Sequence, residues 1–228
     1  MELKHFEEVI GVSFKDKNLL KQAFVHRSYI NEHKNLAVGH NERLEFLGDA
    51  VLELVVTDFL YHKYPDKPEG DLTAYRAALV NAVTLSEQAS MLAMNDYLLL
   101  SKGESRDKGR ARQYILANTY EAVTGAIYLD QGYDVAKTFI ESTVLTNDEK
   151  IVSQSLAQDY KSSFQKKAQE AFSQTPLYKV LSESGPDHNK RFVVGLFIGD
   201  EVIAEGQGHS KQEAEQEAAR HGLEAKDW

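Results

Sequence analysis

The chain has 228 residues, of which 42% are hydrophobic and 27% charged, enough to bury a core in one or two domains. This composition excludes a disordered tail or a fibre, and the absence of cysteine excludes a disulfide framework and a thiolate metal site. The 26 basic and 35 acidic side chains give a net charge of −9, which excludes a protein that coats nucleic acid by positive charge alone. A nucleic-acid enzyme with a locally basic face is not excluded.

The first ten residues lack the order of a secretory signal, and no stretch has the apolar length of a membrane span. We therefore expect a cytoplasmic protein without a membrane partner.

The first half of the chain is predicted to be all α. From Glu7 to about Leu145 the apolar residues recur mostly at helical spacing. The two prolines in this part, Pro65 and Pro68, stand together in a turn-like run. We expect an all-α domain over residues 1–146.

The stretch from Asn41 to Ala50 places three acids on one side of a predicted helix. At about 100° per residue from Glu42, Glu45 falls near 300° and Asp49 near 340°. Apolar residues lie opposite, at about 120° to 220°, and form the expected core stripe: Leu44, Leu47, Val51, Leu54 and Val55. Clustered carboxylates repel one another, and Mg²⁺ is a suitable counter-charge. The pattern leaves two interpretations open, a metal-binding face or an ordinary solvated acidic face.

An aromatic residue stands on the acidic side of the same helix. Phe46 falls at about 40°, away from the core stripe, where a single chain would leave its ring in water. A partner surface could bury this ring, and the alternative is a phenylalanine at the edge of the core.

Further acids follow along the chain. In the run ILANTYEAVTGAIYLD, Asn118 and Glu121 lie one turn apart on a predicted helix and both offer oxygen to a hard cation, although neutral Asn binds less strongly than Asp. An ordinary surface pair is the alternative. Glu69 follows the two prolines and is either a turn acid or a further functional acid.

The pattern changes after a polar stretch, and residues 147–157 are predicted to be a linker. Over residues 158–228 a helical stripe is followed by three strand-like runs, YKVLSES, RFVVGLFIG and EVIAEGQG, with a tight turn at Gly199-Asp200. Ser210 and Glu213 form a capping box that opens a final alanine-rich helix. We expect an α+β domain of the order α-β-β-β-α.

Taken together, the run NERLEFLGDA at 41–50 resembles the signature of the ribonuclease III family. The motifs HRSY at 26–29, EGDLT at 69–73 and ANTYEA ahead of GAIYLD occur in the order that this family shows. The last domain resembles a double-stranded RNA-binding domain, marked by GPDHNKRF at 185–192 and GQGHSK at 206–211. The resemblance covers nearly the whole chain and is closest to bacterial members of the family.

The resemblance implies an endonuclease that hydrolyses both strands of an RNA duplex with Mg²⁺, Mn²⁺ being an expected substitute, and leaves 5′-phosphate and 3′-hydroxyl ends. It assigns Glu45 as a metal ligand, Asp49 as a catalytic acid beside the metal, and Glu121 as the ligand that bridges metal and phosphate. Glu42 and Glu69 would support a second metal or its waters. Members are homodimers in which the signature aromatic, here Phe46, inserts into the partner, and they act in rRNA and mRNA processing.

One position departs from the family pattern, because Asn118 stands where an Asp ligand is usual. The amide oxygen can still coordinate, so we expect a weaker metal affinity or a higher Mg²⁺ requirement rather than a changed reaction. An inactivating change is the alternative. The chief rival function is therefore a non-catalytic binder of double-stranded RNA that keeps the fold, and a third is a structural protein of a ribonucleoprotein particle.

The resemblance also implies how the last domain meets RNA. The first helix of this domain would enter a minor groove of the duplex, His188 would enter the next one, and the last helix would meet phosphates between them. The expected contacts are Ser162, Gln165, Lys166, His188, Lys211 and Gln212. The domain is not basic overall and Gln212 stands where Lys is frequent, so we expect a modest duplex affinity and a shallow salt dependence.

Overall fold

The computed structural model describes residues 3–34, 36–106, 109–152, 160–185 and 190–228. The chain forms two compact units, residues 1–152 and 153–228. Within the described ranges no helix is long and apolar enough to cross a membrane.

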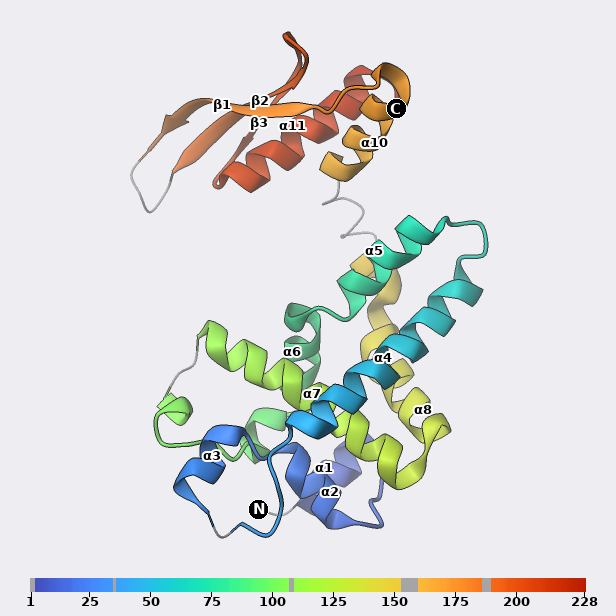
Figure 1. Cartoon of the computed structure of the whole chain (residues 1–228), viewed down its shortest axis with the longest axis vertical. Helices are drawn as coiled ribbons and strands as arrows, with labels where there is room; N and C mark the ends of the chain where they lie inside the picture. Colours follow the sequence, from blue (N-terminus) through green and yellow to red (C-terminus); the bar gives the residue numbers. More distant parts are fainter. Residues whose placement is uncertain (1–2, 35, 107–108, 153–159, 186–189) are drawn as a thin grey trace. The chain divides into compact units, whose positions relative to one another are not determined.

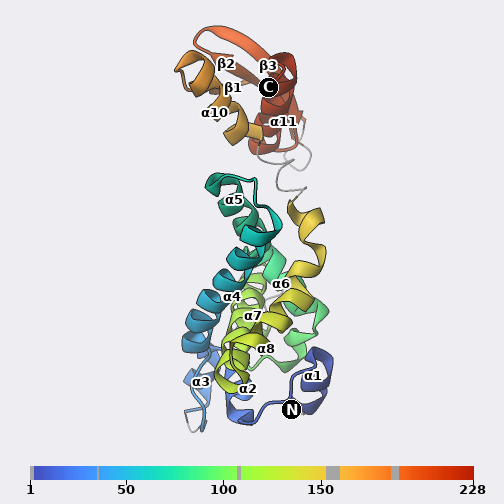
Figure 2. The ribbon, with the colours of Figure 1, turned by 90° about the vertical axis from the view of Figure 1, so that its right-hand side faces the viewer.

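The first unit is helical, as the sequence predicts. Two 22-residue helices, α4 and α7, form its centre and lie against each other in both views of the ribbon (Figure 1 and Figure 2). The elements of this unit are α1 (Leu3–Ile10), α2 (Lys17–Ala23), α3 (Arg27–Glu32), α4 (Glu42–Lys63), α5 (Glu69–Leu79), α6 (Ala82–Met91), η1 (Met94–Tyr97), η2 (Glu104–Arg106), α7 (Arg110–Gln131), α8 (Tyr133–Thr143) and η3 (Val144–Asn147). The all-α prediction for this part of the chain is confirmed.

The core stripe predicted on α4 is wrong at one position. Leu44, Val51 and Val55 are buried as expected, whereas the side chain of Leu54 is 57% exposed. The buried side of α4 instead includes Leu52 and Val56, which pack into the main core. A mixed apolar helix offers two candidate stripes, and only the neighbouring helices decide which of them is buried.

The first unit extends past the expected boundary at residue 146. Residues 148–152, which we assigned to the linker, are helical, and Val152 is buried. The carboxylate of Asp148, itself buried, accepts a hydrogen bond from Lys63 Nζ at 2.6 Å. Because ion pairs of Lys63 with Asp148 and Glu149 and the apolar side chains of Ile151 and Val152 hold this turn against the unit, a segment that is polar in sequence is still part of the fold.

The N-terminal segment is tied to the end of α7 through Asp130. Its carboxylate accepts hydrogen bonds from the backbone N–H groups of Lys15 and Asp16, both at 2.8 Å. Partial burial alone would raise the pKa of Asp130, but these two hydrogen bonds, together with one from the Gln131 side chain and the charge of Lys15, outweigh burial and hold the pKa below its ordinary value. The ionised carboxylate therefore stabilises the folded state.

Replacing Asp130 by Asn should lower the free energy of unfolding at neutral pH by about 1 kcal/mol, because one charged acceptor is lost. A depressed pKa contributes stability above the pKa of the unfolded chain and loses it as the pH falls through the folded value, so the difference from the parent should shrink below about pH 4. Urea unfolding at pH 7 and pH 3 measures both effects. Asp66→Asn, in the exposed turn after α4, is the control, and an Asp130 variant as stable as this control at pH 7 would reject the assignment.

The second unit is an antiparallel sheet covered on one face by two helices, α10 (Tyr160–Phe172) and α11 (Lys211–Ala225). The strands are β1 (Leu177–Ser184), β2 (Arg191–Ile198) and β3 (Glu201–Gly208), in the order β1-β2-β3. Phe164, Leu196 and Ala218 meet in a small core between sheet and helices. This confirms the expected α-β-β-β-α order.

Two turn features of the second unit form as their residues predict. Gly199 adopts a φ of +59° in the tight turn between β2 and β3, a conformation that other residues rarely take. At the start of α11, the Glu213 backbone N–H donates to Ser210 Oγ at 3.1 Å, and the Glu213 carboxylate accepts from the His209 N–H at 2.7 Å. The capping box therefore fixes where α11 begins.

Candidate active site between helices α4 and α7

Two glycines let α4 and α7 approach backbone to backbone. A Cβ atom at Gly48 would overlap the carbonyl oxygen of Glu121, and one at Gly125 would overlap the carbonyl oxygen of Leu44. No other residue fits at either position while the helices keep this distance. The close approach places the neighbouring acids of α4, Glu45 and Asp49, against the turn of α7 that carries Glu121.

Glu121 is the most strongly perturbed carboxyl of this cluster. Burial raises its pKa to about 8, and the negative charges of Asp49 and Glu45 add to the effect. Burial also raises the pKa of Glu45, as do the charges of Glu42 and Asp49, while a hydrogen bond with the Asn118 side chain opposes the rise. Burial raises the pKa of Asp49, and the charge of Glu53 adds to this effect. The charges of Asp49 and Glu45 on α4 therefore disfavour the ionised form of Glu121 on α7.

The donor set suits a hard divalent cation. Within the described ranges no three carboxylate or imidazole groups converge in an arrangement that would hold a metal ion as the side chains stand. The charges of Glu45 and Asp49 nevertheless raise the pKa of Glu121, and the Asn118 side chain is hydrogen-bonded to Glu45. Clustered oxygen ligands with unbalanced negative charge are what Mg²⁺ prefers. The two-helix cluster is the candidate metal site of the chain.

Glu42 lies at the edge of this cluster. It opens α4, its side chain is 41% exposed, and it forms an ion pair with Arg27 at 3.1 Å. The negative charge of Glu42 also raises the pKa of Glu45. The sequence predicts Glu42 on this side of the helix, but its pairing with Arg27 depends on tertiary contacts that the helical period does not contain.

Glu69 is not brought to the cluster within one chain. It opens α5 and lines a groove of about 470 Å³ with residues of the C-terminal half of α4, among them Thr57, Leu60 and Tyr61. Tyr61 lies about 24 Å along α4 from Glu45 at a rise of 1.5 Å per residue. The expectation that Glu69 supports a second metal is therefore not met by the residues of a single chain.

Phe46 is exposed, as its place on the helix predicts, with 81% of the residue accessible. The exposed side of α4 continues from Phe46 through Leu54 to Tyr61, which are 57% and 68% exposed. These three apolar side chains and the groove beside Tyr61 form one exposed stripe, which we call the α4 stripe. The α4 stripe is therefore a candidate interaction surface.

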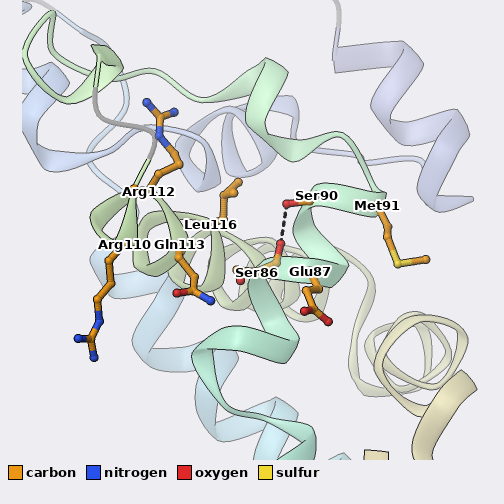
Figure 3. Close-up of a pocket in the computed structure, with 9 residues that line it drawn as sticks. Ser86, Glu87, Ser90, Met91, Arg110, Arg112, Gln113 and Leu116 are labelled. Carbon is orange, nitrogen blue, oxygen red and sulfur yellow. Dashed lines mark hydrogen bonds between the residues drawn. The ribbon is translucent and has the colours of Figure 1, made fainter. Parts of the chain in front are cut away.

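A larger hollow of about 850 Å³ lies between α6 and the N-terminal half of α7, outside the acidic cluster. Figure 3 shows Glu87 and Met91 on the α6 side, and Arg110, Arg112 and Gln113 on the α7 side. The hollow is lined by none of the predicted site residues, and the single carboxylate of Glu87 does not make a metal site.

The predicted RNA contacts of the second unit lie on its surface where they are described. Ser162, Gln165 and Lys166 are exposed on α10, and Lys211 and Gln212 are exposed in the first turn of α11. His188 lies outside the described residues.

An acid near these contacts is not among the residues predicted from the sequence. Glu215 lies one turn after Lys211 on α11 and pairs with Lys161 at 2.6 Å, which places a carboxylate and a partly neutralised lysine beside the expected phosphate contacts. The i, i+4 spacing from Lys211 could have identified this acid. It adds a reason to expect weak attraction of phosphates.

Comparison with known proteins shows the family of both units. Residues 16–148 match the family described as ribonuclease-III-like, and residues 160–226 match the double-stranded RNA binding motif. Among curated relatives, Ribonuclease 3 of Oceanobacillus iheyensis is 44% identical over 99% of this chain and 98% of the relative, and Ribonuclease 3 of Dehalococcoides mccartyi is 43% identical over 98% and 94%. The nuclease domain of ribonuclease III from Campylobacter jejuni is 41% identical, with a TM-score of 0.56, over 62% of this chain and 98% of that domain. The chain therefore belongs to the ribonuclease III family.

Proposed function

We propose that this chain is a Mg²⁺-dependent endoribonuclease that hydrolyses both strands of double-stranded RNA and leaves 5′-phosphate and 3′-hydroxyl ends. The observation that carries the proposal is the charge coupling of Glu45, Asp49 and Glu121 across the α4–α7 contact, in a chain that also contains a double-stranded RNA-binding motif. We further propose that it acts in the cytoplasm in rRNA and mRNA processing, as its resemblance to bacterial members of the family implies.

Each residue of the cluster has a distinct part in this proposal. Glu45, Asn118 and Glu121 would hold the cation, and Asp49 would lie beside it as a catalytic acid. When bound, Mg²⁺, or Mn²⁺ as a substitute, lowers the pKa of the attacking water and offsets charge that develops on the phosphate. Glu121, half-buried and bridging in this assignment, would fix the position of the reacting phosphate.

Asn118 is the ligand whose change reports most directly on metal use. Asn118→Asp adds one negative charge to the cluster, and we expect the Mg²⁺ concentration for half-maximal cleavage to fall roughly tenfold. Cleavage rates of an RNA duplex over a Mg²⁺ series measure this shift. Asn18→Asp, which adds the same charge at an exposed position of α2, is the control.

An unchanged Mg²⁺ midpoint in Asn118→Asp would remove Asn118 from the metal site. A parent that does not cleave, together with an Asn118→Asp variant that does, would identify the natural chain as the non-catalytic binder.

We propose that the chain forms a homodimer through the α4 stripe. A two-fold axis near Glu53 and Leu54 would make the two α4 helices antiparallel and set Phe46 of each chain against the groove beside Tyr61 of the other, a self-complementary arrangement. The same axis would bring Glu69 of each chain toward the acids of the other, which would give Glu69 the supporting role that a single chain does not give it.

Phe46→Ala should weaken the dimer by about 3 kcal/mol, because a buried aromatic ring is lost from the partner's groove. Sedimentation equilibrium of the whole chain measures the dimer Kd, which should rise by about two orders of magnitude. Leu129→Ala, at another exposed apolar position, is the control. A Kd that changes no more than in this control would reject the placement of Phe46.

The second unit would supply duplex binding by shape. Exposed Ser162 and Gln165 suit the 2′-hydroxyls of the wide minor groove of A-form RNA, and Lys211 suits phosphates, helped by the N-terminal end of α11. His188 belongs to the same proposal as the contact in the next minor groove. Because Glu215 lies among these residues, we expect a modest affinity.

Incubation of a long RNA duplex with the pure protein over a Mg²⁺ series tests the proposed function. We expect the duplex to be cut into short fragments with 5′-phosphate ends and 3′ overhangs. Retention of the duplex without cleavage, even at high Mg²⁺, would contradict the proposal and favour the non-catalytic binder. An isolated chain that sediments as a monomer would favour the structural protein of a ribonucleoprotein particle.

A further inference from the structure

The N-termini of α3 and α4 meet directly beside the acidic cluster. Arg27 opens α3, Glu42 opens α4, and Arg27 Nη1 lies 3.1 Å from Glu42 Oε1. The second oxygen of Glu42 lies 3.7 Å from His40 Nδ1. Both groups of the Arg27–Glu42 pair are well exposed, at 68% and 41%, and pairs of this kind contribute little to stability. The role of the pair therefore depends on where it lies.

The backbone around the pair is rigidly held. Asn41, which is 2% exposed, donates from its backbone N–H to the Val25 carbonyl at 2.9 Å and from its side chain to the Ala23 carbonyl at 3.3 Å. The His26 N–H donates to the Leu99 carbonyl at 3.1 Å. These hydrogen bonds fix the starts of α3 and α4 relative to each other, so Arg27 and Glu42 are placed together by the fold rather than by chance contact of two long side chains.

The Glu42 carboxylate has basic side chains on one side and an acidic neighbour on the other. Arg27 and His40 lie on one side, and the charge of Glu42 acts on Glu45 on the other. A divalent cation in the cluster would attract Glu42, and Arg27 competes with the cation for the same carboxylate. The guanidinium has further N–H donors, is exposed, and suits a phosphate oxygen as well as a carboxylate.

We propose that Arg27 is a positioning residue of the proposed nuclease: it holds Glu42 back from the cation site in the free protein and exchanges it for a backbone phosphate when the RNA duplex binds. This inference rests on the proposed function of the acidic cluster. It assigns a role to the HRSY motif at 26–29 that the cluster itself does not explain, and it links RNA binding to the charge of the metal site.

Arg27→Gln tests the inference because its two expected effects have opposite signs. Loss of the positive charge and release of Glu42 should tighten Mn²⁺ binding to the RNA-free protein about fivefold, as followed by the electron paramagnetic resonance signal of free Mn²⁺. Loss of one phosphate contact should weaken binding of an RNA duplex in EDTA and make the slope of log affinity against log salt shallower by about one. A merely structural role would not move the two affinities in opposite directions.

Two matched variants complete the experiment, and thermal unfolding checks that each variant is folded. Arg27→Lys keeps the charge and should stay close to the parent in both measurements. Arg220→Gln removes an arginine that also pairs with an acid, Glu224 at 2.7 Å on α11, and it should leave Mn²⁺ binding unchanged.

An Arg27→Gln protein with parental Mn²⁺ affinity and parental salt slope would overturn the inference, and so would a change of both affinities in the same direction. In both cases cleavage by the parent would leave the proposed function intact. A parent that neither binds Mn²⁺ nor cleaves would overturn both proposals.

Discussion

Replacing Gly48 by alanine should lower the free energy of unfolding by at least about 3 kcal/mol and abolish cleavage. The added Cβ would overlap the backbone carbonyl of Glu121, which cannot rotate away as a side chain could, so α4 and α7 must separate. Separation removes packing in the centre of the first unit and also parts Glu45 and Asp49 from Glu121. Chemical denaturation and a duplex-cleavage assay measure the two losses.

Gly70→Ala is the matched control for this substitution. Gly70 lies in α5, and a Cβ added there meets nothing within 4 Å, so alanine should be neutral or stabilise the helix by up to about 1 kcal/mol. If Gly48→Ala is as stable as Gly70→Ala, the helices do not approach at this glycine and the geometry of the site is wrong.

Glu121→Gln should reduce the cleavage rate by about three orders of magnitude or more while leaving the fold intact. The amide has nearly the shape of the carboxylate but lacks the charge that a bridging ligand supplies. Burial and the charges of Asp49 and Glu45 disfavour the ionised form of the Glu121 side chain. The neutral amide should therefore not lower the melting temperature of the metal-free protein. Single-turnover cleavage and thermal unfolding separate the two effects.

Glu87→Gln is the control for Glu121→Gln, because Glu87 is an exposed acid of α6 outside the acidic cluster and should tolerate the change with a much smaller effect on the rate. A Glu121→Gln protein that cuts at the parental rate would remove Glu121 from the catalytic site. Duplex binding should be retained in both variants, since the RNA-binding motif is unchanged.

Much of this arrangement could be predicted from the sequence, because it depends on local rules. The helical period places Phe46 away from Leu44 and Val51, and the ring is exposed as predicted. The period also opposes Glu45 and Asp49 to the core stripe, and here the prediction is wrong, because α4 buries Leu52 and Val56 on the side of these acids. The second unit is equally local in origin, since alternation, a Gly-Asp turn and a capping box specify its strands and its last helix.

What could not be predicted depends on contacts between distant segments. The periodicity of α4 does not show that Gly48 meets Glu121, nor that Leu54 belongs to an exposed stripe. The pairing of Arg27 with Glu42 depends on hydrogen bonds from Asn41 to residues earlier in the chain. Helical period gives the direction of a side chain and not its partner, so the cluster could be proposed from sequence but its edges could not.

Mn²⁺ titration of the RNA-free protein tests the central claim most directly, because it measures metal binding apart from catalysis. We expect the parent to bind Mn²⁺. The double variant Glu45→Gln/Glu121→Gln should bind Mn²⁺ with an affinity lower by at least about tenfold, and a thermal unfolding transition shows that this variant is folded. A double variant that binds Mn²⁺ as tightly as the parent would show that the acids of α4 and α7 do not hold the cation.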